Sequence, residues 1–379
     1  MKQHILEHEA RSYYFFERAL LTTFSRAMAY GQAYITEEAQ VHGAQNVLAA
    51  THKGPYLWLF RHECMHDAFN LAPLWKELPD LPPMLIASRT QHSPIPFVRE
   101  IVGAVMHPVV FELHRVSMGE GKTEVEKEAL RQENERRLNR VKASLRKGVH
   151  AAMFPEGTVK TNGRISKIRA GCYNISHLQR EDGGIDIIPA IPLGLTYDFM
   201  SGKQGFFGRK SLVFINIGKP IVYAPVERND GESYEAYIKR DIHAFTGRIR
   251  DDFISLSAIT TAQLCSEQLL QKSIDQRYDV SRESLSVVIA QKVEKLRSIE
   301  GLMIDEALLD SDLRNHRVRR CYRTLEEEGF IAQGKINAER CLKEPSNLDG
   351  YYKENPVLFS ANRLYEMMQY DQRIADAMR

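Results

Sequence analysis

The sequence predicts an α/β protein with a mixed, mostly parallel sheet flanked by helices, an amphipathic helical segment before the sheet and a helical domain after it. Three observations support this fold class. Short apolar runs alternate with polar segments between residues 46 and 227, a long charged segment with helical periodicity lies among them, and the strand-like runs cease beyond residue 228. Alternation of this kind is typical of layered α/β folds.

Residues 1–45 form the first predicted segment. Apolar side chains recur in it at spacings of three and four, as on one face of an amphipathic helix. They are Tyr13, Phe16, Leu20, Phe24 and Ala27. Residues 13–16 are all aromatic, which suits a helix lying on a bilayer surface. The alternative is an ordinary helix packed on the main domain, and both interpretations stay open.

Residues 46–227 form the predicted α/β domain. Its candidate strands are short apolar runs of the kind that make buried parallel strands. They lie at residues 46–50, 56–60, 84–88, 109–113, 150–154, 185–195 and 211–218. Residues 122–147 carry many opposite charges over a thin apolar stripe, which predicts a surface helix supported by ion pairs one turn apart.

Residues 228–379 are predicted to form a helical accessory domain. Its part near residues 280–340 is similar to a winged-helix core, with a basic helix that ends at Gly329. The chain as a whole has 51 Lys and Arg residues against 49 Asp and Glu residues. This near-neutral balance argues against a dedicated nucleic-acid binder, so no nucleic-acid partner is expected.

The composition also predicts a location for the protein. Five cysteines occur without a C-x-x-C pair, which is typical of free thiols in a reducing compartment. No apolar run reaches the roughly 18 residues that suggest a membrane-spanning helix, and the N-terminus lacks the apolar core of a signal peptide. We therefore expect a cytoplasmic protein whose contact with a membrane is peripheral.

The stretch "HECMHD", residues 62–67, is compatible with two chemistries. As H-E-x-x-H it would bind zinc through His62 and His66, with Glu63 polarising a water molecule. As H-x-x-x-x-D it pairs a general base, His62, with Asp67, which would hold the imidazole in its productive tautomer. The positions that supply the third zinc ligand in metzincins hold other residues, which favours the second interpretation.

A second polar segment follows the apolar run at residues 150–154. It begins with Pro155, Glu156, Gly157 and Thr158 and continues with the cations Lys160, Arg164, Lys167 and Arg169. Gly157 permits close approach of the backbone, so amides near it can face a phosphate or an oxyanion. The four cations offer ligands for a phosphate group.

Four motifs between residues 46 and 225 resemble the glycerolipid acyltransferases, the family of lysophosphatidate and glycerol-3-phosphate acyltransferases. They are H-x-x-x-x-D at residues 62–67, "GAVMHPVVFELHR" at 103–115, "FPEGT" at 154–158 and "IIPAIPLGLTY" at 187–197. Three departures stand beside them. Arg61 replaces the family's Asn, the second motif is longer than usual, and Val159-Lys160 replaces Arg-Ser. These departures leave the phosphate ligands and the acceptor open.

The resemblance implies a membrane-associated O-acyltransferase of phospholipid biosynthesis. It would move a fatty acyl group from acyl-CoA or acyl carrier protein to a hydroxyl of 1-acylglycerol 3-phosphate, with glycerol 3-phosphate as the alternative acceptor. His62 and Asp67 would be catalytic. Substrate binding would involve Phe111, Arg115, Glu156, Gly157, Thr158, Lys160, Arg164 and Arg169. No metal or other cofactor is implied. Two remote alternatives are a zinc hydrolase using His62, Glu63 and His66, and an inactive lipid-binding protein.

Overall fold

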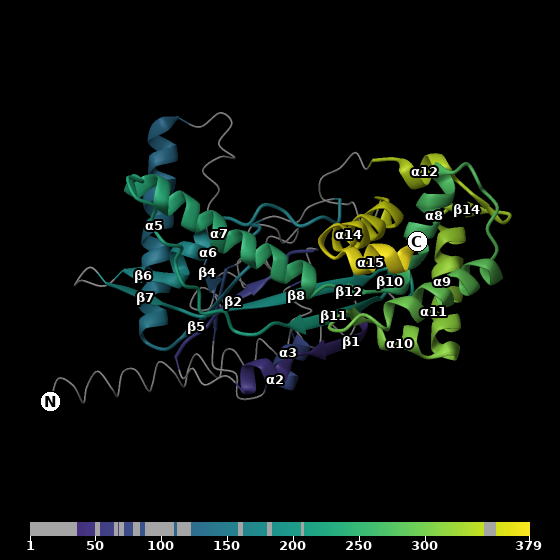
Figure 1. Cartoon of the computed structure of the whole chain (residues 1–379), viewed down its shortest axis with the longest axis horizontal. Helices are drawn as coiled ribbons and strands as arrows, with labels where there is room; N and C mark the ends of the chain where they lie inside the picture. The colour runs from purple at the N-terminus through teal and green to yellow at the C-terminus, as the bar shows by residue number, and fades with distance from the viewer. Residues whose placement is uncertain are drawn as a thin grey trace.

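The central sheet is the main feature of the computed structural model (Figure 1). The structure describes residues 36–49, 54–63, 67, 72–78, 84–87, 110–111, 123–157, 162–179, 184–205, 208–344 and 354–379. The sheet has seven strands in the order β1-β11-β8-β2-β5-β3-β4. Their bounds are β1 Thr36–His42, β2 Leu57–Phe60, β3 Met84–Ala87, β4 Val110–Phe111, β5 His150–Met153, β8 Ala190–Asp198 and β11 Ser211–Ile217. β11 and β8 pair antiparallel and the other neighbours pair parallel, which confirms the predicted fold class.

Helices cover both faces of this sheet, as a largely parallel sheet requires. Side chains of β2 alternate between the faces. Leu57 and Leu59 join the apolar cluster that includes α5 (Glu124–Arg146), α6 (Gly171–Ser176) and α7 (Tyr234–Ser255). Trp58 and Phe60 join the opposite cluster, with α3 (Ala72–Glu77). All four side chains are fully buried, and burial of each contributes about 1.5–3 kcal/mol.

The helical part of the chain follows β11. Its helices are α8 Thr261–Ile274, α9 Arg282–Leu296, α10 Glu306–Leu309, α11 Ser311–Glu327, α12 Ala338–Leu342, α14 Pro356–Tyr370 and α15 Gln372–Met378. Short strand pairs lie beside the helices and the main sheet: β6 (His177–Gln179) with β7 (Ile185–Ile187), β9 (Gln204–Gly205) with β10 (Gly208–Arg209), β12 (Ala258–Ile259) with β13 (Met303–Ile304), and β14 (Ile331–Ala332) with β15 (Lys335–Ile336). α7 lies beyond the predicted boundary at residue 228, yet it packs on the sheet through Phe245, Ile249 and Phe253.

The basic helix of the predicted winged-helix region is α11, and Gly329 follows it with a φ of +71°. The elements α9, β13, α10, α11, β14 and β15 follow one another as helix, strand, two helices and hairpin. Arg317 of α11 pairs with Glu38 at 2.6 Å, and Arg320 pairs with Glu37 at 3.0 Å. This part of the cationic surface of α11 therefore faces β1.

One expected strand is wrong. Residues 46–50 do not form a strand: helix α2 spans Ala44–Leu48, and Leu48 is 70% exposed. Gly43, with a φ of +81°, begins this helix, and the Asn46 side chain donates to the carbonyl oxygen of Ile217 at 2.7 Å. β1 already occupies the position beside β11. An apolar run of five residues does not by itself distinguish a strand from a helix.

Two other predicted elements are refined by the structure. The run at residues 185–195 divides into β7, which pairs with β6, and β8 of the main sheet, on either side of Ile188 and Pro189. The charged helix expected at 122–147 is confirmed as α5, which begins at a capping box between Thr123 and Glu126. The helical segment expected at residues 1–45 lies outside the described residues up to residue 35. Its remaining part is not one helix, because Thr36–His42 form strand β1 of the main sheet.

Candidate active site

His62 and Asp67 lie together just after β2. Nδ1 of His62 is 2.7 Å from Oδ2 of Asp67, although residues 64–66 between them lie outside the described part. The Asp67 side chain is 1% exposed, whereas that of His62 is 20% exposed. An ionised carboxylate only accepts hydrogen bonds, so Nδ1 carries the hydrogen and Nε2 keeps the lone pair that a general base needs.

Two further donors hold Asp67 in place. Tyr197, in β8, donates its hydroxyl to Oδ1 at 2.6 Å, and the backbone N–H of Glu63 donates to Oδ2 at 2.6 Å. Each carboxylate oxygen therefore has a fixed donor besides the imidazole. Tyr197 lies at the end of the fourth motif, but its contact with Asp67 was not predicted. The pairing of β2 with β8 extends only to Phe60 and Leu193, so Tyr197 reaches Asp67 beyond the end of β2.

The turn after Phe154 lies beside this pair. The rings of Phe154 and His62 are 4.6 Å apart, measured between centroids. Glu156 is buried and its two oxygens accept from two backbone amides: His62 N–H at 2.8 Å and Ser166 N–H at 2.7 Å. Its carboxylate thus joins the loop after β2 that carries His62, the candidate catalytic loop, to the loop after "FPEGT". Burial raises the pKa of Glu156 to about 7.

Gly157 has a left-handed backbone with a φ of +65° and lies on the exposed side of the turn. Its own N–H donates to the carbonyl oxygen of Phe154 at 2.9 Å and closes the turn. This N–H is therefore engaged, and an oxyanion would need amides other than that of Gly157. The nearest heavy atom to a Cβ added at Gly157 is Cγ of Arg169, at 3.9 Å.

The other predicted substrate-binding residues are only partly covered by the structure. Arg164 and Arg169 are exposed on the loop that follows the turn. Phe111 is the last residue of β4, and its side chain is outside the described part. Arg115, Thr158 and Lys160 lie wholly outside it. The roles of these residues stay predictions.

Arg61 precedes His62 at the position where the glycerolipid acyltransferases have Asn. It is the centre of a buried group of charges. Its Nε is 2.9 Å from Oε1 of Glu63, and NH1 donates to Oγ of Ser257 at 2.5 Å. NH2 donates to the carbonyl oxygen of Gly163 at 3.2 Å and lies 3.6 Å from Oε2 of Glu366. Burial lowers the pKa of Arg61, while nearby carboxylates, first that of Glu366, oppose this shift.

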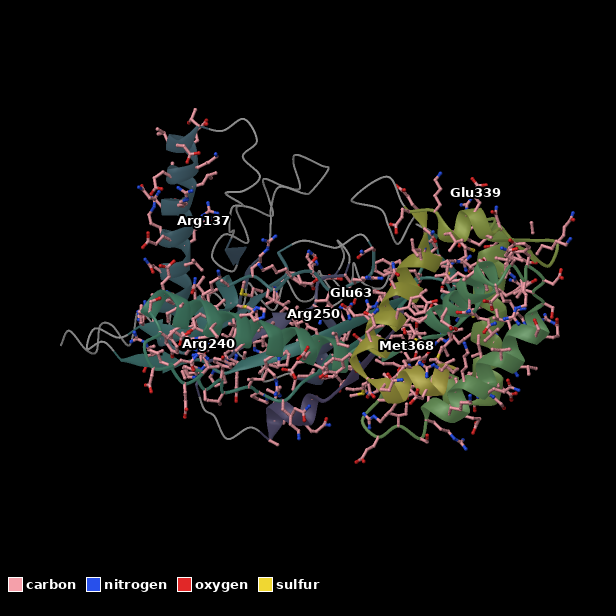
Figure 2. All side chains as sticks on the ribbon, turned by 45° about the horizontal axis from the view of Figure 1, so that its top comes forward. Glu63, Arg137, Arg240, Arg250, Glu339 and Met368 are labelled. Atoms are coloured by element: carbon pink, nitrogen blue, oxygen red, sulfur yellow. The ribbon has the colours of Figure 1, made fainter. Side chains whose placement is uncertain are left out.

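Helix α14 supplies the rest of the group. Arg363 forms an ion pair with Oε2 of Glu63, and both side chains are almost fully buried. Arg363 also donates to the carbonyl oxygen of Leu195 at 3.3 Å. Glu366 accepts from the backbone N–H of Ile165 at 3.0 Å and pairs with Arg250 of α7 at 3.0 Å. Figure 2 shows Glu63 and Arg250 near these C-terminal helices. Sequence reasoning missed this group, because no local motif links α14 to residues 61–63.

The zinc interpretation does not fit this geometry. Its motif requires two histidines on one helical face, but His62 and Glu63 lie outside any helix. Both carboxylate oxygens of Glu63 face arginines, so they are not free to polarise a water molecule. Among the described residues, no group of three or more metal-ligating side chains is found. His66 lies outside the described part.

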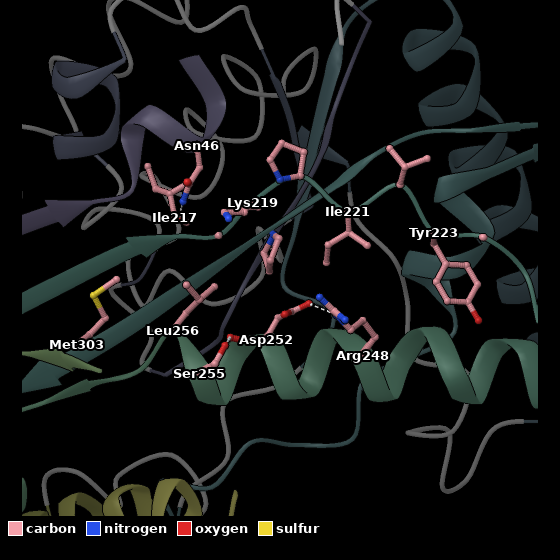
Figure 3. A pocket seen from close by; sticks show the side chains of 15 residues that line it. Asn46, Ile217, Lys219, Ile221, Tyr223, Arg248, Asp252, Ser255, Leu256 and Met303 are labelled. Atoms are coloured by element: carbon pink, nitrogen blue, oxygen red, sulfur yellow. Dashed lines mark hydrogen bonds and ion pairs between the residues drawn. The ribbon is translucent and has the colours of Figure 1, made fainter. Parts of the chain in front are cut away.

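A surface pocket of about 770 Å³ lies elsewhere. It is formed by α7 and the segment that follows β11, and Figure 3 shows Arg248 and Asp252 of α7 paired at its wall. Pro192 of β8 also lines it, and none of the predicted site residues that the structure describes does. The His62 loop, and not this pocket, is therefore the candidate active site. None of the described helices is long and apolar enough to cross a bilayer.

Comparisons with known proteins point to an acyltransferase domain in the first half of the chain. A solved structure, the 1-acyl-sn-glycerophosphate (LPA) acyltransferase PlsC from Thermotoga maritima, shows a weak likeness, with a TM-score of 0.37 and 14% identity over 62% of this chain and 81% of that chain. No curated protein matches the sequence significantly. Residues 38–192 match the family model described as Acyltransferase. This match includes His62, Asp67 and "FPEGT", and it agrees with the resemblance to the glycerolipid acyltransferases.

Proposed function

We propose that the protein transfers a fatty acyl group from acyl-CoA or acyl carrier protein to a hydroxyl of a glycerol-phosphate acceptor. The observation that supports this most strongly is the contact of 2.7 Å between Nδ1 of His62 and Oδ2 of Asp67 beside the turn after Phe154. It leaves Nε2 of a partly exposed imidazole as the basic atom. A hydroxyl nucleophile supplied by the substrate needs such a base.

In the proposed reaction, Nε2 of His62 takes the proton of the acceptor hydroxyl while the oxygen attacks the thioester carbonyl carbon. The tetrahedral intermediate then collapses with cleavage of the carbon–sulfur bond. The leaving thiolate receives the proton from the imidazolium, so the products are an ester and a free thiol. Asp67, held by Tyr197 and by the amide of Glu63, keeps the imidazole oriented through both proton transfers.

For the acceptor we propose 1-acylglycerol 3-phosphate, with its phosphate bound by cations of the loop after the turn. Arg164 and Arg169 are exposed there, and Arg115, Thr158 and Lys160 are the further candidates. Glu156 is assigned to joining the two loops, because backbone amides occupy both its oxygens. The lipid acceptor also implies peripheral association with the cytoplasmic face of a membrane.

The test is a thiol-release assay with acyl-CoA or acyl carrier protein as donor. Release that depends on 1-acylglycerol 3-phosphate supports the proposed acceptor, and release only with glycerol 3-phosphate supports the alternative. We expect His62→Ala to lose about 10²- to 10⁴-fold in kcat, the usual contribution of a positioned base. His66→Ala is expected to retain activity, which a zinc site would not allow. Wild-type turnover by a folded His62→Ala protein would reject the mechanism.

A further inference from the structure

Helix α14 contacts the loop that follows the "FPEGT" turn through main-chain and side-chain atoms. The Asn362 side chain donates to the carbonyl oxygen of Asn162 at 3.0 Å. The backbone N–H of Ile165 donates to Glu366 at 3.0 Å. Gly163 lies so close that an added Cβ would be 2.2 Å from the carbonyl oxygen of Phe359. This loop and α14 are therefore packed backbone against backbone.

The same helix holds the residues on both sides of His62. Arg363 pairs with Glu63, and Glu366 lies 3.6 Å from Arg61. Arg61 in turn donates to the carbonyl oxygen of Gly163, so it joins the catalytic loop to the loop that α14 covers. The chain around His62 is thus fixed at positions 61 and 63 by charged side chains that come from a distant part of the sequence.

A short series of contacts connects α14 to the imidazole. The Arg363 guanidinium pairs with the Glu63 carboxylate, and the Glu63 backbone N–H donates to Oδ2 of Asp67 at 2.6 Å. The same Oδ2 atom contacts Nδ1 of His62. A shift of Glu63 would therefore move a donor of Asp67 and change the orientation of the base. Misplacement of a reacting group by about 1 Å can cost roughly 10²-fold in rate.

We propose that Arg363 and Glu366 of α14 are positioning residues for acyl transfer, acting through Glu63 and Arg61 to orient His62. This inference rests on the proposed role of His62 as the base. It assigns a catalytic purpose to the C-terminal region and to Arg61, the residue that departs from the family. Neither Arg363 nor Arg61 is proposed to contact the substrate.

The test compares Glu63→Gln, Arg363→Gln and the double variant, with Arg373→Gln of α15 as the matched control. Arg373 pairs with Asp371 at 2.6 Å, and its side chain is 63% exposed. Folding is checked by circular dichroism, and kcat and KM are measured for donor and acceptor. The proton on Nδ1 of His62 is followed by NMR, because its hydrogen bond to Asp67 gives it a distinct downfield signal.

We expect each single variant to lose about 10- to 100-fold in kcat with KM changed less than about threefold, and to shift or broaden the Nδ1 proton signal. The double variant should be no worse than the poorer single variant, because the two side chains act as one pair and neither is left charged without its partner. Arg373→Gln should match the wild type. A loss of stability alone would not change kcat or the signal in the folded protein.

A folded Arg363→Gln protein with wild-type kcat and a wild-type Nδ1 signal overturns the inference, as does a change confined to KM. If Arg363→Gln does not fold, the double variant is judged by the same criteria, and Glu366→Gln follows it. His62→Ala separates the two proposals. Loss of activity in His62→Ala together with normal Arg363→Gln rejects only the positioning role, whereas normal His62→Ala rejects the proposed mechanism itself.

Discussion

Helices α5 and α14 both carry arginines paired with glutamates, but they use them differently. On α5 the pairs lie on the surface: Arg131 contacts Glu128 at 3.1 Å, and both side chains are more than half exposed. On α14, Arg363 and Glu366 are buried against the catalytic loop. Exposed pairs typically contribute 0.2–1 kcal/mol, whereas removing one partner of a buried pair costs about 3–5 kcal/mol. Burial of an ion pair, and not the type of its residues, therefore determines how much the pair contributes to stability.

The largest effect on stability is expected at Arg363. Arg363→Ala leaves the buried Glu63 with only Arg61 as its partner and removes a donor from Leu195. We predict a loss of about 3–5 kcal/mol in the free energy of unfolding, measured by urea denaturation at neutral pH. A loss below about 1 kcal/mol would place this pair with the surface pairs of α5 and remove the contrast.

A change of pH should alter the contribution of another buried carboxylate of the site, that of Glu156. Burial raises the pKa of Glu156 from its ordinary 4.5 to about 7. Because the folded pKa is raised, the contribution of Glu156 to stability is fully present below pH 4.5 and is lost as the pH rises through 7. The difference corresponds to about 3 kcal/mol.

Glu156→Gln removes this titration. The free energy of unfolding of the wild type, minus that of Glu156→Gln, should fall by about 3 kcal/mol between pH 4.5 and 8. Burial also raises the pKa of Asp305, to about 6, but that group is present in both proteins and cancels in the difference. A difference that is flat with pH, or that rises, would contradict the prediction.

The structure also shows which parts of the site the sequence can predict. His62 and Asp67 are five positions apart, and parallel strands β2 and β5 bring His62 to the turn after Phe154, so a motif and a strand pattern suffice. The contacts of Tyr197 with Asp67 and of Arg363 with Glu63 depend on how distant elements pack. That packing cannot be read from a single sequence, because Arg363 has no local pattern that distinguishes it from a surface arginine.

The third prediction compares two glycines that both have positive φ. Gly163→Ala places a Cβ 2.2 Å from the carbonyl oxygen of Phe359, so the loop and α14 must separate. We expect a loss of about 1–3 kcal/mol from overpacking, in addition to the cost of the left-handed backbone. Gly157→Ala meets no atom closer than 3.9 Å and should incur only the backbone cost. Thermal unfolding of both variants measures this, and equal losses would show that α14 does not hold the loop tightly.

The smallest effect is expected on α5. Arg137, labelled on this helix in Figure 2, pairs with Glu133 one turn away at 2.7 Å, with about 30% of each side chain exposed. Arg137→Gln should lower the free energy of unfolding by about 0.3–0.5 kcal/mol at low salt. The loss should vanish near 1 M salt, where the screening length is only about 3 Å. The loss caused by Arg363→Ala should persist at that salt concentration, because ions do not reach a buried pair. If instead both losses disappear with salt, the charges around Glu63 are hydrated. The pair between Arg363 and Glu63 then contributes no more to stability than a surface pair of α5.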